Sequence, residues 1–451
     1  MTVTRTSRVR ASGTALAVAL VAMFAFAGSP SAFGAPAAPP LAKSGNVTVL
    51  GTVGTGPALG INFKGHYAYV TGPQGLTVLD IADPAAPSIV TFHPLPHFEN
   101  EDVDLCGNVL LISNDREAKD LGAVLYVFDI SNPASPAIAG TLPLGLTGNG
   151  RGSGHIANFV KADCTMAWID GGDHVEVVDL RDPAAPKSLG KFVSVASDSD
   201  NFRVTHDTER DSKGLLWSVG GGGAAAYQLT AKPLAPKLVA STTRGGANPS
   251  PYNDFILHNS QRRGNTLLIT EEDYVDTDEV PPGSCHGQGK FETWSLSRMA
   301  PGAIKPLDTW QTELNGVLFG GSADSKAPVT VNCSSHWFDT VGNIAAVGWY
   351  EQGTRFLDVS KPGTIRQVGY YLPANGSTWA AYWSPTDPSH SIVYTADAYL
   401  GVEVLKIARK STNAEMATLK APIPNSWYGE GGLPYEASSV WRFSCPRLDI
   451  A

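Results

Sequence analysis

Residues 78–87 read VLDIADPAAP, a short apolar run that ends in an aspartate and leads into a turn flanked by prolines. Near copies return at residues 127–136 (VFDISNPASP) and 177–186 (VVDLRDPAAP). Apolar runs bounded by turn-forming residues are typical of β-strands. Their return about every 50 residues indicates a repeat architecture in which each copy is one supersecondary unit.

Seven repeats of this kind can be followed along the chain. They cover residues 60–95, 97–144, 154–195, 202–243, 252–313, 329–372 and 377–409. The last repeat lacks an outer strand, and residues 46–53 (NVTVLGTV) resemble the strands that close the other repeats. Sheets repeated around an axis leave only short edges. We therefore predict an all-β fold, a seven-bladed β-propeller closed by an N-terminal strand that completes the last blade. Divergence of the fourth and fifth repeats leaves six or eight blades as alternatives.

The composition agrees with this fold class. The 451 residues include 47 glycines and 32 prolines, and only 17% are charged, which suits short strands joined by tight turns. The net charge is −9. An acidic chain without basic runs argues against a nucleic-acid partner.

The N-terminal segment has the features of a targeting sequence. Arg5, Arg8 and Arg10 precede an uncharged apolar run at residues 15–27. We predict a signal peptide at residues 1–34, with an uncleaved membrane anchor as the alternative. Cleavage would leave no membrane span and a secreted or extracytoplasmic protein. After it we expect a flexible linker (35–45), the propeller (46–410) and a C-terminal tail packed on the propeller (411–451).

Five cysteines in an exported chain favour disulfides. Cys106 and Cys164 occupy matching places in neighbouring repeats, and Cys285 and Cys333 flank one long insertion. We predict these two disulfides, and Cys445 then has no predicted partner. Buried free thiols are the alternative.

The recurring V-x-D-[IVL]-x-[DN]-P-x-x-P segments resemble those of the LVIVD-repeat family of extracytoplasmic propellers. The likeness extends over nearly the whole mature chain and is again recognisable at residues 356–362 (FLDVSKP). It implies a propeller but no particular activity, because that family carries no catalytic motif to transfer. As a propeller that bears histidines, the chain also has a more distant likeness to the selenium-binding protein and methanethiol oxidase family. No shared motif assigns that family's functional residues to positions in this sequence.

Five histidines fall at similar places in successive repeats, near the entry of the innermost predicted strand. They are His97, His155, His206, His258 and His336. The innermost strands of a propeller surround its axis, so these side chains should meet at one mouth of the channel. Neutral imidazoles bind Zn, Cu or Fe. The pattern therefore predicts a metal site, with structural hydrogen bonds or a metal-free polar pocket as alternatives.

Acidic residues fall in two roles. Those near the histidines, or in the loops after the second strands, are candidate ligand-binding groups: Glu99, Asp102, Asp207, Glu272 and Asp397. The aspartates of the repeated motif precede turns, where a carboxylate accepts backbone N–H bonds. We assign these a scaffold role: Asp80, Asp129, Asp179 and Asp358.

Two main functions follow from this pattern. One is a monomeric secreted or cell-surface propeller that binds a small molecule or an extracellular protein at its funnel face. The other is a metal-dependent enzyme, an oxidoreductase or a hydrolase, with a histidine-lined site at the channel mouth. A purely structural surface protein is a third alternative, and the sequence leaves enzymatic activity open because propellers serve many functions.

Overall fold

The structure is a computed structural model whose propeller lies within the compact unit Ala32–Ala451. It describes residue 40 and residues 42–95, 101–114, 123–144, 154–197, 204–242, 255–273, 289–312, 334–350, 352–374 and 376–408. The predicted signal peptide and C-terminal tail lie outside the described residues. So do His97, Glu99, Cys285, Cys333 and Cys445.

The first three blades are antiparallel four-stranded sheets in which consecutive strands pair. Their strands are β3 (Gly60–Lys64), β4 (Tyr67–Gly72), β5 (Gly75–Asp80), β6 (Ser88–Pro94), β7 (Asp104–Cys106), β8 (Val109–Asn114), β9 (Val124–Asp129), β10 (Ala137–Pro143), β11 (Ala157–Phe159), β12 (Met166–Ile169), β13 (Val175–Asp179) and β14 (Lys187–Phe192). The second and third strands are buried, and the outermost strands β6, β10 and β14 are largely exposed. Each blade therefore faces the axis with its first strand and solvent with its fourth.

The fourth and fifth blades repeat this order despite their divergent sequences. They comprise β15 (Thr205–Arg210), β16 (Leu216–Gly220), β17 (Gly223–Gln228), β18 (Lys237–Ser241), β19 (Phe255–Arg263), β20 (Thr266–Asp273), β21 (Phe291–Ser295) and β22 (Lys305–Trp310). Because both divergent repeats form complete blades, the blade number is seven, as predicted.

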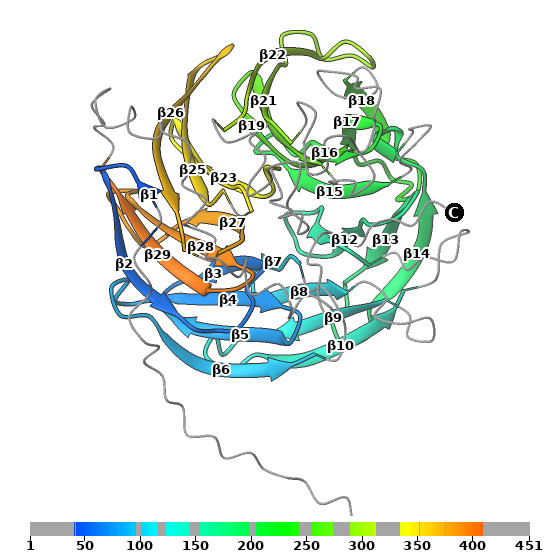
Figure 1. The fold of residues 1–451 in the computed structure, drawn as a ribbon. Helices are drawn as coiled ribbons and strands as arrows, with labels where there is room; N and C mark the ends of the chain where they lie inside the picture. Colours follow the sequence, from blue (N-terminus) through cyan, green and yellow to red (C-terminus); the bar gives the residue numbers. More distant parts are fainter. Residues whose placement is uncertain are drawn as a thin grey trace, which may run out of the picture. The chain divides into compact units, whose positions relative to one another are not determined.

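The last two blades take strands from both ends of the described chain. They comprise β23 (Phe338–Val341), β24 (Ile344–Gly348), β25 (Thr354–Lys361), β26 (Thr364–Leu372), β27 (Thr378–Trp383), β28 (Ile392–Asp397), β29 (Gly401–Ile407), β1 (Ala42–Lys43) and β2 (Val47–Val53). Strand β2 pairs with β29, from Val47 opposite Ile407 to Val53 opposite Val402, which confirms the predicted closure. Figure 1 shows the blue β2 beside the orange β29.

Two residues of the segment predicted to be a flexible linker (35–45) form a strand. Ala42 and Lys43 form β1, which pairs with β26 at the outer edge of the sixth blade. The buried Ser44 accepts a hydrogen bond from the Tyr370 N–H. An exposed sheet edge offers unpaired backbone groups, and β1 uses those of β26.

The blades close into a ring around one axis. Each innermost strand contacts the next, from β3 through β7, β11, β15, β19 and β23 to β27, which returns to β3 (Figure 1). The cores lie between neighbouring blades. In one of them, Trp217 and Val219 of the fourth blade pack with Leu267, Ile269 and Trp294 of the fifth. The innermost strands of all seven blades therefore surround a common axis.

The motif aspartates have the predicted scaffold role. The carboxylates of Asp80, Asp129, Asp179 and Asp358 each accept the backbone N–H two residues later, at 2.8 to 3.0 Å. Among the described residues the one helical segment is the 3-10 turn Val195–Ser197. No helix long and apolar enough to cross a membrane occurs in that part of the chain.

Candidate metal centre

Four of the predicted histidines meet at the entries of the innermost strands. His155 precedes β11, His206 and His258 lie in β15 and β19, and His336 precedes β23. Irregular pairing between Thr205 and Asp207 in β15, and between Leu257 and Ser260 in β19, places His206 and His258 at β-bulges. A bulge re-aims a side chain that regular alternation would send elsewhere. All four histidines are at most 5% exposed.

Glu101 lies at the centre of these imidazoles. Its Oε2 is 2.6 Å from His155 Nε2, and its Oε1 is 3.1 Å from His336 Nε2, 3.2 Å from His258 Nε2 and 4.0 Å from His206 Nε2. Its carboxylate is 2% exposed and comes from the segment before β7, in the second blade. We call Glu101, His155, His206, His258 and His336 the metal centre.

Backbone carbonyls fix two of the rings. His206 Nδ1 lies 2.9 Å from the His258 carbonyl oxygen, and His336 Nδ1 lies 2.9 Å from the Trp379 carbonyl oxygen. A carbonyl only accepts, so each Nδ1 carries the proton and a neutral ring turns the Nε2 lone pair towards Glu101. Contacts of this kind orient metal-ligating histidines.

A glycine makes room for His155. Gly171 has a φ of +114°, and a Cβ built on it would lie 2.4 Å from the His155 Cβ. Any larger residue at position 171 would displace the histidine. The loop after β12 therefore shapes the metal centre without contributing a ligand.

The electrostatics favour an ionised Glu101 carboxylate and neutral imidazoles at His206 and His258. Burial raises the pKa of Glu101, but attraction and a hydrogen bond from His155 outweigh it, with smaller contributions from His258 and His336, and the net pKa is well below its usual value. Burial, reinforced by His258 and His155, lowers the pKa of His206 well below its usual value. Burial, with His336, lowers the pKa of His258 to about 4. Deprotonated carboxylates and neutral imidazoles are the forms that bind metals.

The donor set fits a transition metal. Ligand atoms at about 2.1 Å from one ion, at angles of about 90–110°, lie about 3.0–3.4 Å apart. The distances from Glu101 Oε1 to His258 and His336 fall in that range, and the Nε2 atoms of His155 and His206 are 2.9 Å apart. Because His206 Nε2 carries a lone pair, a proton on His155 Nε2 or a metal ion must lie between these two atoms. Imidazole nitrogens suit Zn, Cu or Fe.

Glu272 supplies a further donor. Its Oε2 is buried, has no hydrogen-bond partner in the described part of the chain, and lies 3.9 Å from His258 Nε2. Its Oε1 accepts a hydrogen bond from the Tyr350 hydroxyl. The ligand atoms of His206, His258 and Glu272 lie within 4.8 Å of one another. This predicted ligand-binding residue therefore borders the metal centre.

The other predicted acidic residues have different places. Asp207 and Asp102 are buried beside His206 and Glu101, and Asp207 Oδ1 accepts a hydrogen bond from Asn158 Nδ2. Asp397 does not join the metal centre, because its carboxylate accepts the N–H groups of Tyr399 and Leu400 in the seventh blade. The predicted ligand-binding residues include Glu99 and Asp102 but not Glu101, for which the acidic segment at residues 99–102 is the only signal in the sequence.

One predicted disulfide is present. Cys106, at the end of β7, is bonded to Cys164 in the third blade, with Cα atoms 5.5 Å apart. It links the second and third blades at the ends of their innermost strands opposite the metal centre.

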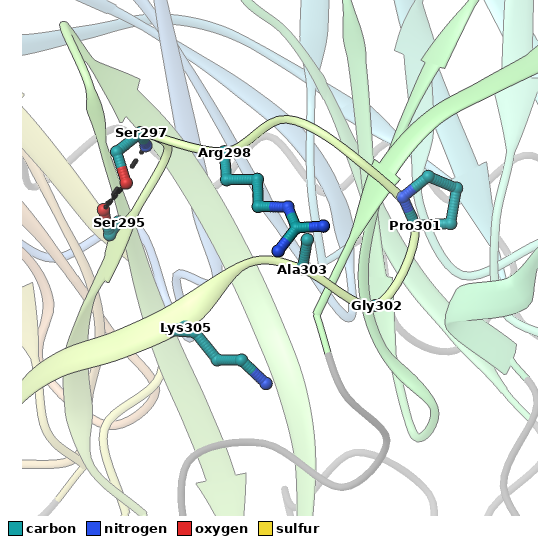
Figure 2. Close-up of a pocket in the computed structure, with 7 residues that line it drawn as sticks. All are labelled: Ser295, Ser297, Arg298, Pro301, Gly302, Ala303 and Lys305. Carbon is teal, nitrogen blue, oxygen red and sulfur yellow. Dashed lines mark hydrogen bonds between the residues drawn. The ribbon is translucent and has the colours of Figure 1, made fainter.

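A pocket of about 480 Å³ lies away from this chemistry. Figure 2 shows it in the turn between β21 and β22, with Arg298 and Lys305 beside Ser295 and Ser297. It is lined by two cationic side chains and by no histidine or carboxylate. This pocket therefore does not belong to the metal centre.

The comparisons with solved structures concern the fold. The crystal structure of the Myceliophteria thermophila Cps50 (Swd1) β-propeller domain matches with a TM-score of 0.53 and 10% identity, over 80% of this chain and 100% of that chain. The computationally designed Ika8 protein matches with a TM-score of 0.46 and 13% identity, over 78% of this chain and 96% of that chain. No curated protein matches the sequence.

The repeat itself is identified from the sequence. The model of the LVIVD repeat matches residues 55–92 and 120–142, which include the first two copies of the motif. These residues contribute to the first and second blades. The protein is therefore a seven-bladed β-propeller that carries LVIVD repeats.

Proposed function

We propose that this propeller is a secreted, metal-dependent enzyme, an oxidoreductase or a hydrolase, that holds a Zn, Cu or Fe ion at the metal centre. The observation that carries the proposal is the convergence of four buried imidazoles on the buried Glu101 carboxylate. Such an ion, when bound, supplies Lewis-acid or redox chemistry.

The chain's own residues define what surrounds the ion. The His258 and Trp379 carbonyls orient two imidazoles, and the Tyr350 hydroxyl holds the Glu272 carboxylate. Tyr350 has a φ of +42°, a conformation that a non-glycine residue adopts at a cost. Hydrogen bonds in both directions between Tyr350 and Thr378 hold this backbone. Glu272 is thereby kept beside His258, where it could act as a ligand or as a base.

The disulfide supports the extracytoplasmic location. Disulfides persist in oxidising compartments and are rare in the reducing cytosol. The Cys106–Cys164 bond is consistent with export, and the N-terminal segment has the composition of a signal peptide. Cell fractionation, followed by mass measurement of the exported chain without reductant, tests both. A full-length chain retained in the cytosol with free thiols would contradict this location.

Non-catalytic binding is the second candidate. In it His155 donates a hydrogen bond to Glu101 and the cluster closes without a metal, and a small molecule or an extracellular protein binds at the funnel face. The short contact between His155 and Glu101 favours this alternative, because 2.6 Å suits a charge-assisted hydrogen bond. The seven blades are completed within one chain, so both candidates are proposed for a monomer.

Metal analysis of untagged, exported protein separates the two candidates. We expect a stoichiometric transition metal in the wild type and its loss in the double variant His206→Ala/His258→Ala. His66→Ala is the matched control, because this exposed residue lies outside the metal centre. Thermal unfolding verifies that the double variant is folded. Wild-type protein that remains metal-free after incubation with Zn²⁺, Cu²⁺ and Fe²⁺ would contradict the enzyme and leave non-catalytic binding.

A further inference from the structure

Carboxylates continue along the innermost strands beyond the metal centre. Asp104, Glu209 and Asp339 each come three residues after a member of the metal centre: Glu101, His206 and His336. An extended chain rises about 3.3 Å per residue, so these groups lie up to about 10 Å further along the chain. They come from the second, fourth and sixth blades and are all partly exposed. We call them the channel carboxylates.

The channel carboxylates lie close enough to affect one another. Burial, followed by the charges of Asp104, Asp102 and Asp339, raises the pKa of Glu209 to about 8. Burial also raises the pKa of Asp104 to about 6. The neighbouring carboxylates therefore repel an ionised Glu209. A bound cation would offset that repulsion.

A pocket opens beside two of them. Its volume is about 230 Å³, and Asp104, Asn158 and Glu209 contribute to its wall. The same wall includes Cys106, Phe159 and Arg210, at the ends of β7, β11 and β15, and the cationic Lys161. The pocket therefore lies at the ends of the innermost strands opposite the histidines.

Asp207 lies between this pocket and the metal centre. It follows His206, is fully buried, and uses Oδ1 to accept the hydrogen bond from Asn158, a residue of the pocket wall. Its Oδ2 is buried and has no hydrogen-bond partner among the described residues. A buried carboxylate oxygen with unused acceptor capacity is costly unless a cation can approach it.

We propose that the channel carboxylates and Asp207 form a conduit through which a divalent cation passes from the pocket to the metal centre. This proposal rests on the proposed metal-binding function and adds the route of loading. The ligands of the metal centre are almost completely buried, so an ion must lose most of its hydration to reach them. Fixed carboxylates along the path replace lost water and raise the local cation concentration.

The test measures the rate of metal uptake by metal-free protein. Trp337 and Trp379 lie 5.8 Å from His258 and 4.8 Å from His336 between ring centroids, so Co²⁺ binding should quench tryptophan fluorescence in a stopped-flow experiment. Among the described residues none donates a hydrogen bond to Glu209, so Glu209→Gln removes charge without a structural contact. We expect it to slow uptake about 3- to 10-fold, and the triple variant Asp104→Asn/Glu209→Gln/Asp339→Asn at least about 10-fold.

The matched control removes the same number of charges from exposed turns: Asp83→Asn/Asp129→Asn/Asp182→Asn. It should slow uptake less than about 2-fold, because exposed charges are screened. Bound Co²⁺ at the end point should equal that of the wild type in every variant. Glu209→Gln alone suffices if the triple variant does not fold.

Two results would overturn the conduit. If the wild type binds Co²⁺ and Glu209→Gln loads at the wild-type rate, the conduit is wrong and the metal centre stands. If the wild type takes up no Co²⁺, both the proposed function and the conduit fall.

Discussion

Aspartates at the outer turns and carboxylates along the channel have opposite electrostatics. Hydrogen bonds from Arg181 lower the pKa of Asp179 to about 2, and hydrogen bonds from Ser131 lower that of Asp129. Burial raises the pKa of Asp104 to about 6 and, with Asp104 and Asp102, that of Glu209 to about 8. The outer carboxylates have donors and solvent, whereas Glu209 has no hydrogen-bond donor among the described residues and lies near the charges of Asp104, Asp102 and Asp339.

The difference separates scaffold from chemistry. The outer aspartates recur in the LVIVD motif, and each closes a turn within its own blade. Glu101 and the histidines come from different blades and act together only because the ring closes. The repeated motif therefore identifies the residues that build a blade, and the candidate metal ligands lie outside that motif.

The largest expected effect tests whether metal affinity depends on the carboxylate at the metal centre and not on those at the outer turns. Glu101→Gln should weaken Zn²⁺ binding about 10- to 100-fold, because it removes the charge at the centre of the imidazoles. Asp179→Asn, its match on the outer turns, should bind like the wild type. Calorimetric titration of metal-free protein measures both. Equal affinities in the two variants would remove Glu101 from the metal centre.

The second prediction concerns stability. An ion that binds only the folded state stabilises it by about 2.7 kcal/mol when its free concentration is about 100 times Kd. Adding Zn²⁺ to metal-free protein should therefore raise the unfolding temperature of the wild type and of Asp179→Asn equally. The same addition should raise that of Glu101→Gln less. If Zn²⁺ still raises the unfolding temperature of His206→Ala/His258→Ala, the ion binds elsewhere.

The third prediction concerns two glycines with positive φ. Gly171→Ala should force His155 away, lower Zn²⁺ affinity and cost about 1–3 kcal/mol of stability. Gly65 has a φ of +61°, and a Cβ added there would meet open space. Gly65→Ala therefore introduces backbone strain alone. Denaturant unfolding and metal titration compare the two. Gly65→Ala should leave metal affinity unchanged, and the idea fails if Gly171→Ala does too.

The smallest effect is a contrast in pH dependence, measured by denaturant unfolding of metal-free protein. Asp179 has a folded pKa of about 2, below its ordinary 3.8. Its contribution to stability is present above pH 3.8 and is lost as the pH falls towards 2. Asp179→Asn should flatten that acid limb.

The pKa of Glu209 is shifted in the opposite direction, so its effect on stability changes with pH in the opposite direction too. Its folded pKa of about 8 lies above its ordinary 4.5, so stability should decrease as the pH rises from 4.5 towards 8. Glu209→Gln should make that decrease smaller and leave the acid limb intact, because Asp102 and Asp104 also have raised pKa values. Identical pH profiles for this variant and the wild type would contradict the raised pKa.

Most of the fold could be predicted from sequence, because its signals are local. The motif around Asp80, Asp129 and Asp179 indicated the blade, and the orphan strand at residues 46–53 indicated the closure, which β2 and β29 confirm. The pairing of β1 with β26 could not be predicted, because two residues carry no periodicity.

The site was only partly predictable. The phase of the histidines indicated their convergence, because equivalent positions in a ring face one axis. Glu101 was missed because the segment before β7 is not a strand, and no alternation decides which of Glu99, Glu101 and Asp102 points inward. The bulges at His206 and His258 likewise depend on pairing with β16 and β20, which sequence does not reveal.

The pairing of β2 with β29 imposes an order on folding. Val47 leaves the ribosome early, and its partner Ile407 follows only after six blades' worth of chain. Contacts so distant in sequence form slowly, because the intervening segment must first be brought together. Until β2 docks, the edge of β29 is bare and could pair with another chain. Variants that lack residues 46–53 keep this bare edge, so their aggregation should be the most severe.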